Sequence, residues 1–418
     1  MGAEREPRKQ GVEALLELLP QLREMLTRVK QVELEQVSLD IGDLELFIPL
    51  GATGVPAPGC GAGTGAAAPL PPGPRELIRE TFTPVRTEYP ARIREVVLGA
   101  TKAEGGTRGT TVTIGGAAGP AYTGLETPPP HLPVIAMDVF DYRVPLPKVL
   151  KRHVEDVLDD PGEWAKRLVD RYGAEMVTVH LLSTDPLIRN TSPAAAAKTV
   201  ETVLQAVDVP LIIGGCGDPK KDAAVFSEVA AMADGERLLL NSVTHEMAEA
   251  RTLEVVARAA KAHGHRVIAF SPLELNSARE LNRRLYDYLP PESIVMDLTT
   301  VALGYGLEYS FTIHERARHA ALMGDPELAH PTASGCTNAW AAREAWMQLD
   351  PAYGPQEIRG PLWETLNALI LLSAGVDLFM MMHPAAIRTV REMAGELHRL
   401  AAPDTDRYCS WTTVQIQG

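Results

Sequence analysis

Eight short apolar runs rich in β-branched residues recur between residues 134 and 383, and segments with helical spacing of their apolar positions separate them. The runs lie near residues 134, 176, 209, 237, 266, 293, 330 and 377. Parallel strands need helical crossovers and are buried on both faces, so this alternation predicts a parallel sheet. Eight such units over about 250 residues predict a (β/α)8 TIM barrel over 134–402, with a doubly wound open sheet as the alternative.

Several helix boundaries are marked in the sequence. Asp160-Pro161, Ser192-Pro193 and Asp218-Pro219 each place a capping oxygen before a proline, which is favoured at the first helical position. Gly173 and Gly264 suit helix ends, where a left-handed backbone is common. These signals support helices between the predicted strands.

The chain before residue 134 follows a different pattern. Residues 12–29 have helical spacing interrupted by a proline, and residues 37–48 alternate around a Gly-Asp turn. They predict a small helix-plus-hairpin module over 1–50, which we interpret as a docking element. Residues 51–74 are almost wholly Gly, Ala and Pro, a composition typical of a flexible linker.

A second hairpin is expected closer to the barrel. Residues 94–100 and 109–116 are two apolar, β-rich runs joined by a polar, Gly-rich turn, within an extension that spans 75–133. Residues 403–418 form a C-terminal tail.

The composition restricts the partners of the chain. Its 40 basic and 54 acidic residues give a formal charge of -14, which disfavours a nucleic acid or an anionic membrane as the main partner. No apolar run approaches the roughly 20 residues that span a bilayer, and MGAEREPRKQ lacks the apolar core of a signal peptide. We therefore expect a cytoplasmic protein without a membrane segment.

The four cysteines do not form a recognisable site. They lie at positions 60, 216, 336 and 409, far apart and without a C-x-x-C pair. The sequence therefore predicts reduced thiols, with neither a disulfide framework nor a self-contained zinc or iron-sulfur site.

In a TIM barrel the binding residues lie where the strands end. Most of the polar residues at these positions are uncharged hydrogen-bonding groups, and glycines accompany them. The candidate binding residues are Asp138, His180, Asn241, Asp297, Thr299, Thr300, Ser334, Gly335, Thr337, Asn338 and His383. No His/Glu cluster has metal-ligand spacing and no nucleophile elbow is present, so we expect no metal ligands and assign no catalytic residue.

Alternatives remain open for individual candidates. Asp297 ends an apolar strand, where burial would raise its pKa, so it is either an acid or ligand anchor, or a cap of its own loop. His180 and His383 are either proton donors or hydrogen-bonded parts of the rim. The Gly-rich turn 214–217 could cradle a phosphate through backbone amides, but turn geometry alone explains its glycines.

Long ordered strings give a specific resemblance. VFDYRVPLPKVLKRHVEDVLDDPGEWAKRLVD, MVTVHLLSTDPLIRNTSP, MDLTTVALGYGLEYSFTIHERARHAALMGD, SGCTNAWAAREAWM and DLFMMMHP resemble the delta subunit of the acetyl-CoA decarbonylase/synthase (CO dehydrogenase/acetyl-CoA synthase) complex. This family is the small subunit of the corrinoid iron-sulfur protein. The resemblance runs from about Gly109 to about Leu400.

The resemblance implies a methyl carrier of the anaerobic reductive acetyl-CoA (Wood-Ljungdahl) pathway of carbon fixation. In this family the barrel forms a heterodimer with a larger gamma subunit that holds the iron-sulfur cluster, and a corrinoid (cobalamin or another cobamide) is shared at their interface. The cobalt accepts a methyl group that a methyltransferase delivers from methyl-tetrahydropterin and passes it to the nickel of acetyl-CoA synthase. In reverse, with CO dehydrogenase, the same carrier dismantles acetyl-CoA.

Two other functions are consistent with the residues. An autonomous methyl-tetrahydropterin-dependent methyltransferase is one, since Asn241 and Asp297 match pterin-binding positions of related barrels. However, Gly215 stands where a carboxylate is expected there, and a lost charge-assisted hydrogen bond costs roughly 1.5–3 kcal/mol. The other is a purely architectural subunit of the complex. Whether the chain holds an active site of its own stays open.

Overall fold

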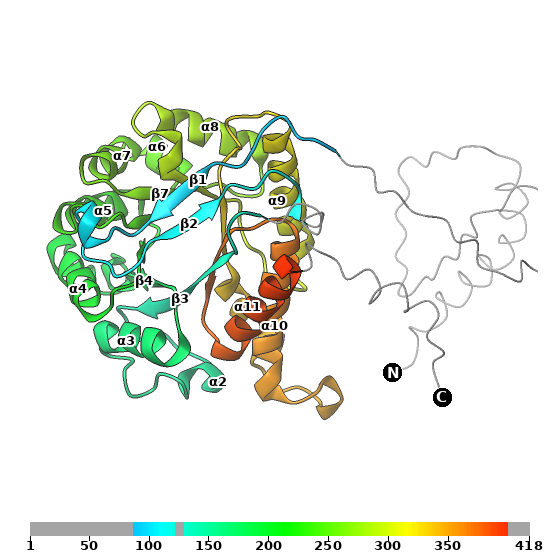
Figure 1. Ribbon diagram of the computed structural model, residues 1–418. Coiled ribbons are helices and arrows are strands. Elements are labelled where there is room, and N and C mark those ends of the chain that lie inside the picture. The colour runs from blue at the N-terminus through cyan, green and yellow to red at the C-terminus, as the bar shows by residue number, and fades with distance from the viewer. Residues whose placement is uncertain (1–86, 122–128, 400–418) are drawn as a thin grey trace, which may run out of the picture. The chain divides into compact units, whose positions relative to one another are not determined.

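The computed structural model describes residues 87–121 and 129–399. Its centre is a closed barrel of eight parallel strands in the order β10-β3-β4-β5-β6-β7-β8-β9 (Figure 1). The strands are β3 (Val134–Phe140), β4 (Met176–His180), β5 (Leu211–Gly214), β6 (Leu239–Val243), β7 (Arg266–Phe270), β8 (Ile294–Asp297), β9 (Thr332–Gly335) and β10 (Leu378–Met381). Each lies in a predicted run. Because β10 pairs with both β3 and β9, the barrel prediction is confirmed and the open-sheet alternative is wrong.

Helices surround the barrel (Figure 1). They are α2 (Lys148–Lys151), α3 (Pro161–Tyr172), α4 (Pro193–Ala206), α5 (Pro219–Met232), α6 (His245–Glu249), α7 (Leu253–Ala262), α8 (Leu275–Tyr286), α9 (Leu307–Leu322), α10 (Gln356–Ser373) and α11 (Pro384–Arg399). Short 3-10 helices are η1 (Lys102–Glu104), η3 (Leu182–Thr184), η4 (Pro291–Ser293), η5 (Cys336–Ala341), η6 (Arg343–Ala345) and η7 (Pro351–Tyr353).

The predicted helix boundaries are confirmed. The side chains of Asp160, Ser192 and Asp218 accept hydrogen bonds from backbone amides in the first turns of α3, α4 and α5. Gly173 ends α3 with φ 65°, and Gly264 follows α7 with φ 78°. The three N-terminal side-chain caps satisfy amides that a helix N-terminus would otherwise leave without partners.

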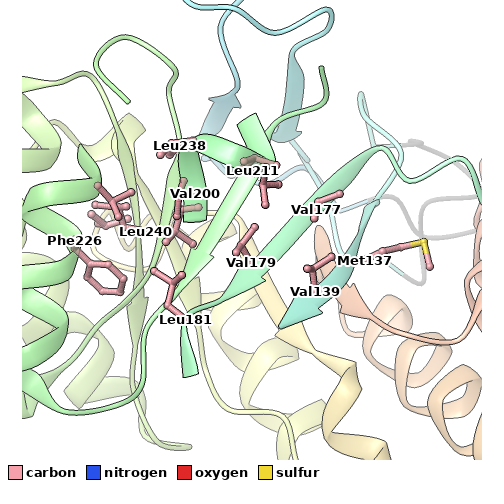
Figure 2. Close-up of a cluster of buried hydrophobic side chains, with 14 of the residues drawn as sticks. Met137, Val139, Val177, Val179, Leu181, Val200, Leu211, Phe226, Leu238 and Leu240 are labelled. Carbon is pink, nitrogen blue, oxygen red and sulfur yellow. The ribbon is translucent and has the colours of Figure 1, made fainter. Parts of the chain in front are cut away.

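The strands bury both faces, in two separate cores. The outward-facing side chains of β3 and β4, such as Met137, Val139, Val177 and Val179, belong to the core between barrel and helices, which also contains Phe226 of α5 (Figure 2). The inward-facing set fills the barrel and comprises Val134, Ala136, Met176, Ile212, Leu239, Ile268, Val295, Ala333, Leu378 and Met380. Burial on both faces explains why the strands read as nearly continuous apolar runs.

The predicted hairpin before the barrel is also confirmed. β1 (Glu95–Leu98) and β2 (Val112–Gly115) pair antiparallel. Val96, Leu98 and Ile114 belong to the same core as the inward-facing strand residues. The hairpin therefore packs its apolar side chains onto the inside of the barrel.

The hairpin lies at the N-terminal ends of the barrel strands. The amide of Gly99 donates to the carbonyl of Arg237, which precedes β6, at 3.0 Å. The amide of Arg94 donates to the carbonyl of Ala329, which precedes β9, at 3.0 Å. The hairpin thus closes this end of the barrel, called the bottom below, and the opposite end is called the mouth.

The predicted module over 1–50, the linker over 51–74 and the tail over 403–418 lie outside the described residues. Within the described part of the chain, no helix is long and apolar enough to cross a membrane.

Candidate functional site

Four of the predicted binding residues continue the inward-facing rows of the barrel strands. Side chains alternate along a strand, so residues two positions after inward-facing core residues also face inward. Asp138 follows Ala136 in this way, and Asn241 and Asp297 follow Leu239 and Val295. His180 ends the row that begins at Met176 in β4. Since all the strands end at the same rim of the closed barrel, the four side chains face the mouth, whereas Gly214 and Gly335 add no side chain there.

Asp138 and His180 form a close pair at one side of the mouth. Nε2 of His180 lies 3.3 Å from Oδ1 of Asp138, although the two atoms lack the alignment of a hydrogen bond. The hydroxyl of Thr337 donates to the other carboxylate oxygen. The His180 ring stacks on Phe140, with centroids 4.8 Å apart. Contacts with Asp138 and Phe140 hold the imidazole of His180 in place at the mouth.

Asp297 is held by its own loop. Its Oδ1 accepts the amide of Thr299 at 2.8 Å, while the Thr299 hydroxyl donates to the carbonyl of Ser271 at 3.1 Å. Burial raises the pKa of Asp297 to about 6, and the Thr299 amide opposes this rise. Asp297 therefore caps the loop with one oxygen, and its position in the inward-facing row leaves it suited to bind a ligand as well.

The remaining polar candidates on this side are linked to one another. The hydroxyls of Thr300 and Ser334 are 2.8 Å apart, and both residues are buried. The side-chain amide of Asn338 donates to the carbonyl of Thr300 at 3.0 Å. A Cβ on Gly335 would meet no atom closer than 3.8 Å, so the space beside it is open. The loops after β8 and β9 are thus joined at the rim.

His383 is placed differently from the other candidates. Its Nδ1 accepts the amide of Ala385 at 3.1 Å, at the start of α11. Its buried ring lies edge-on to His153 and stacks near Trp340, and burial lowers its pKa to about 4. The structure therefore gives His383 a capping contact and does not bring it into the inward-facing group.

Two buried acids near the mouth were not among the predicted residues. Glu364 of α10 accepts the amides of Met382 and His383 at 2.6 and 2.9 Å, and burial raises its pKa to about 8. Asp222 of α5 accepts the amides of Cys216 and Gly217, both at 2.8 Å. Both carboxyl groups hold the backbone that follows a strand.

The position of Asp222 also explains why residue 215 is a glycine. A Cβ on Gly215 would lie 2.4 Å from the Asp222 carboxyl group, so a larger residue does not fit there. The turn 214–217 is therefore built around a side chain from the following helix, and its glycines are required by that packing. The amides that a phosphate cradle would use at Cys216 and Gly217 are already occupied.

A pocket of about 310 Å³ lies between the ends of β4, β5 and β6. Its wall includes His180, Gly214, Asp222, Asn241 and Ser242. A second hollow of about 710 Å³ lies at the bottom, beside Arg108 and Glu236. Among residues 87–121 and 129–399, no group of three His, Cys, Asp or Glu side chains could hold a metal ion.

A TIM barrel sealed at its bottom by a hairpin, with inward-facing polar groups at its mouth, is the arrangement of a barrel protein with a candidate ligand site at one end. The family model of the CO dehydrogenase/acetyl-CoA synthase delta subunit matches residues 95–350. The chain belongs to this family.

Relatives extend the match beyond that range. The acetyl-CoA decarbonylase/synthase complex subunit delta of Archaeoglobus fulgidus is 50% identical over 331 residues, covering 78% of this chain and 72% of that protein. Subunit delta 1 of Methanosarcina thermophila is 45% identical over 377 residues, covering 88% and 85%. Among solved structures, a dihydropteroate synthase of Yersinia pestis aligns with 64% of this chain and 93% of its own, with 14% identity and a TM-score of 0.43.

Proposed function

We propose that the chain acts within an acetyl-CoA decarbonylase/synthase complex as the small subunit of its methyl carrier. Its barrel mouth would face a corrinoid shared with a larger gamma subunit that carries the iron-sulfur cluster. The observation that carries this proposal is the inward-facing group Asp138, His180, Asn241 and Asp297, which offers hydrogen bonds at the end of a sealed barrel.

The residues at the mouth fit a corrinoid. The periphery of a corrinoid bears primary amides, which need both donors and acceptors. The Asn241 side chain is only partly buried, and among the described residues its one hydrogen bond is a long contact to Met380 Sδ, at 3.6 Å. It therefore has a donor and an acceptor to offer to such an amide.

When bound, the corrinoid supplies the cobalt that accepts and releases the methyl group. The chain's own residues would orient it and exclude water. Gly335 adds no side chain at the mouth, and the pair of Asp138 and His180 forms a fixed wall there.

Exposed aromatic residues near the mouth support a partner subunit there. Tyr305, just before α9, and Tyr309, in its first turn, are 56% and 65% exposed, and Trp346, directly after η6, is 43% exposed. The Tyr305 hydroxyl donates to Glu344 at 3.3 Å, which links the two segments. Aromatic side chains are enriched at protein interfaces, so this part of the rim suits the large subunit.

An autonomous pterin methyltransferase is less well supported. The pterin-binding carboxylate expected at position 215 is absent, and the carboxyl group of Asp222 occupies the same space. Both oxygens of Asp222, however, already accept backbone amides. A carboxylate occupied in this way has less capacity to bind an incoming heterocycle. The chain would therefore depend on a separate methyltransferase to deliver the methyl group, and on acetyl-CoA synthase and CO dehydrogenase for the later steps.

Co-expression with the large subunit tests the proposal. We expect the two chains to co-purify with a corrinoid that is visible in the absorbance spectrum. The isolated chain, mixed with methyl-tetrahydropterin and a free Co(I) corrinoid, should give no methyl transfer. Robust turnover by the isolated chain would favour the methyltransferase, whereas a corrinoid environment unchanged by Asn338→Ala and Thr300→Val would favour an architectural subunit.

A further inference from the structure

The pocket between β4, β5 and β6 is a separate compartment of the mouth. It has a volume of about 310 Å³, and its wall includes His180, Gly214, Asp222, Asn241, Ser242 and Thr244. We call it the β5 pocket. Gly214 lets the His180 ring pack against β5, because a Cβ there would lie 2.8 Å from Nδ1 of His180.

Its lining carries both kinds of hydrogen-bonding group and no fixed positive charge. Asn241 offers a donor and an acceptor and Ser242 offers a hydroxyl, whereas both carboxylate oxygens of Asp222 already accept the amides of Cys216 and Gly217. Of the described residues, no lysine or arginine lines the pocket. The nearby Lys221 ammonium donates instead to the side chain of Asn190 at 2.7 Å. A phosphate would lack a countercharge in this pocket.

The unused hydrogen-bond donors and acceptors of the pocket favour a neutral ligand group. Within the described part of the chain, the Asn241 side-chain amide makes a single long contact, to Met380 Sδ at 3.6 Å, so its hydrogen-bonding capacity is largely unused there. A primary amide presents two N–H donors and one carbonyl acceptor, which complements the side-chain amide of Asn241. A methyl ester keeps the carbonyl acceptor but has a bulkier alkoxy group in place of the donor.

We propose that the β5 pocket binds one primary-amide side arm of the corrinoid and so fixes the rotation of the corrin ring over the mouth. This inference rests on the proposed function. It makes Asn241 a specificity-determining residue for corrinoids with amide arms.

The test uses the complex of this chain with its large subunit, freed of corrinoid and titrated with two probes. One probe is cobinamide, whose arms are amides, and the other is heptamethyl cobyrinate, whose arms are methyl esters. Wild type should bind cobinamide at least about tenfold more tightly than the ester, as expected for one well-made hydrogen bond in a buried site. Absorbance of the bound corrinoid reports binding without any methyl transfer.

Asn241→Leu should abolish most of this preference by weakening cobinamide alone. Ser242→Ala is a second variant with a smaller change in side chain, for the case in which Asn241→Leu does not fold. Asn276→Leu is the matched control, because Asn276 is exposed on α8 and does not line the pocket. Circular dichroism of each variant checks the fold.

The possible failures are distinguishable. Equal binding of both probes by wild type, or equal weakening of both by Asn241→Leu, would overturn the amide-arm proposal and leave the proposed function intact. Binding of neither probe by the wild-type complex would overturn both. If Asn241→Leu weakened methyl-tetrahydropterin binding and left both corrinoids unaffected, the pocket would belong to a heterocycle instead.

Discussion

The bottom and the mouth of the barrel use buried polar groups in opposite ways. At the bottom, the buried Arg108 guanidinium donates to Glu236 at 2.8 Å and to the carbonyls of Val207 and Leu204 at 2.5 and 2.8 Å. At the mouth, the buried hydroxyls of Thr178 and Ser271 have no hydrogen-bond partner in the described part of the chain. The Arg108 cluster thus satisfies its buried charge within the chain and contributes stability, whereas these hydroxyls at the mouth leave hydrogen-bonding capacity unused.

Removal of the bottom ion pair should have the largest effect on stability. Arg108→Ala leaves the buried Glu236 carboxylate without its partner, so we expect a loss of about 3–5 kcal/mol in the free energy of unfolding, measured by urea denaturation. Arg283→Ala is the control, because its pair with Glu327 is more exposed, and it should cost at most about 1 kcal/mol. Similar losses in both variants would remove the distinction between a buried and an exposed pair.

A methyl group at the β5 turn should have the next largest effect. Gly215→Ala places its Cβ 2.4 Å from the Asp222 carboxyl group, and we expect a loss of about 1–3 kcal/mol in the same assay. Gly335→Ala is matched to it at the mouth, since the new Cβ lies 3.8 Å from Nδ2 of Asn338, an ordinary contact distance, and should be tolerated. Tolerance of Gly215→Ala would show that Asp222 does not fix this turn.

The pH dependence of the free energy of unfolding should reveal the raised pKa of Glu364. Its pKa is about 8 in the folded chain and near 4.5 when unfolded, so the folded state binds the additional proton between these values. Stability from this group is present below pH 4.5 and is lost as pH rises toward 8, at no more than roughly 1.4 kcal/mol per pH unit. The free energy of unfolding of wild type minus that of Glu364→Gln should therefore decrease from pH 5 to pH 8. A difference independent of pH would contradict the raised pKa.

The smallest effect is expected at Thr178. Thr178→Val removes a buried hydroxyl without a partner, so stability should change by less than about 1 kcal/mol and can increase. Thr300→Val removes a hydroxyl that lies 2.8 Å from that of Ser334, and should cost about 1–3 kcal/mol. Thermal denaturation of both variants makes the comparison. An equal loss at Thr178 would mean that its hydroxyl is already paired.

The fold was predictable because its signals are local. Continuous apolar runs mark strands buried on both faces, and Asp160, Ser192 and Asp218 mark helix starts beside prolines. Closure also followed from the count of runs, and the pairing of β10 with β3 confirms it. Alternation along each strand then places the predicted residues Asp138 and Asn241 on the inner face.

The structural details of the site were less predictable because they depend on tertiary packing. Asp222 and Glu364 lie within helices, where an acid normally indicates a solvent-exposed face, and only packing turns them toward strand ends. His383 follows a strand directly, as a mouth residue should, yet its ring packs with His153 and Trp340 while its Nδ1 caps α11. A sequence position after a strand does not specify the direction of the side chain.

The β1–β2 hairpin closes the barrel at its bottom and leaves it open at one end. Val96, Leu98 and Ile114 fill the bottom, so whatever enters the mouth must leave by the same route. Two large partners cannot occupy one opening at once. A protein of this shape that served several partners would have to admit them in turn, and the time that each spends at the mouth would set the order and the rate of the exchange.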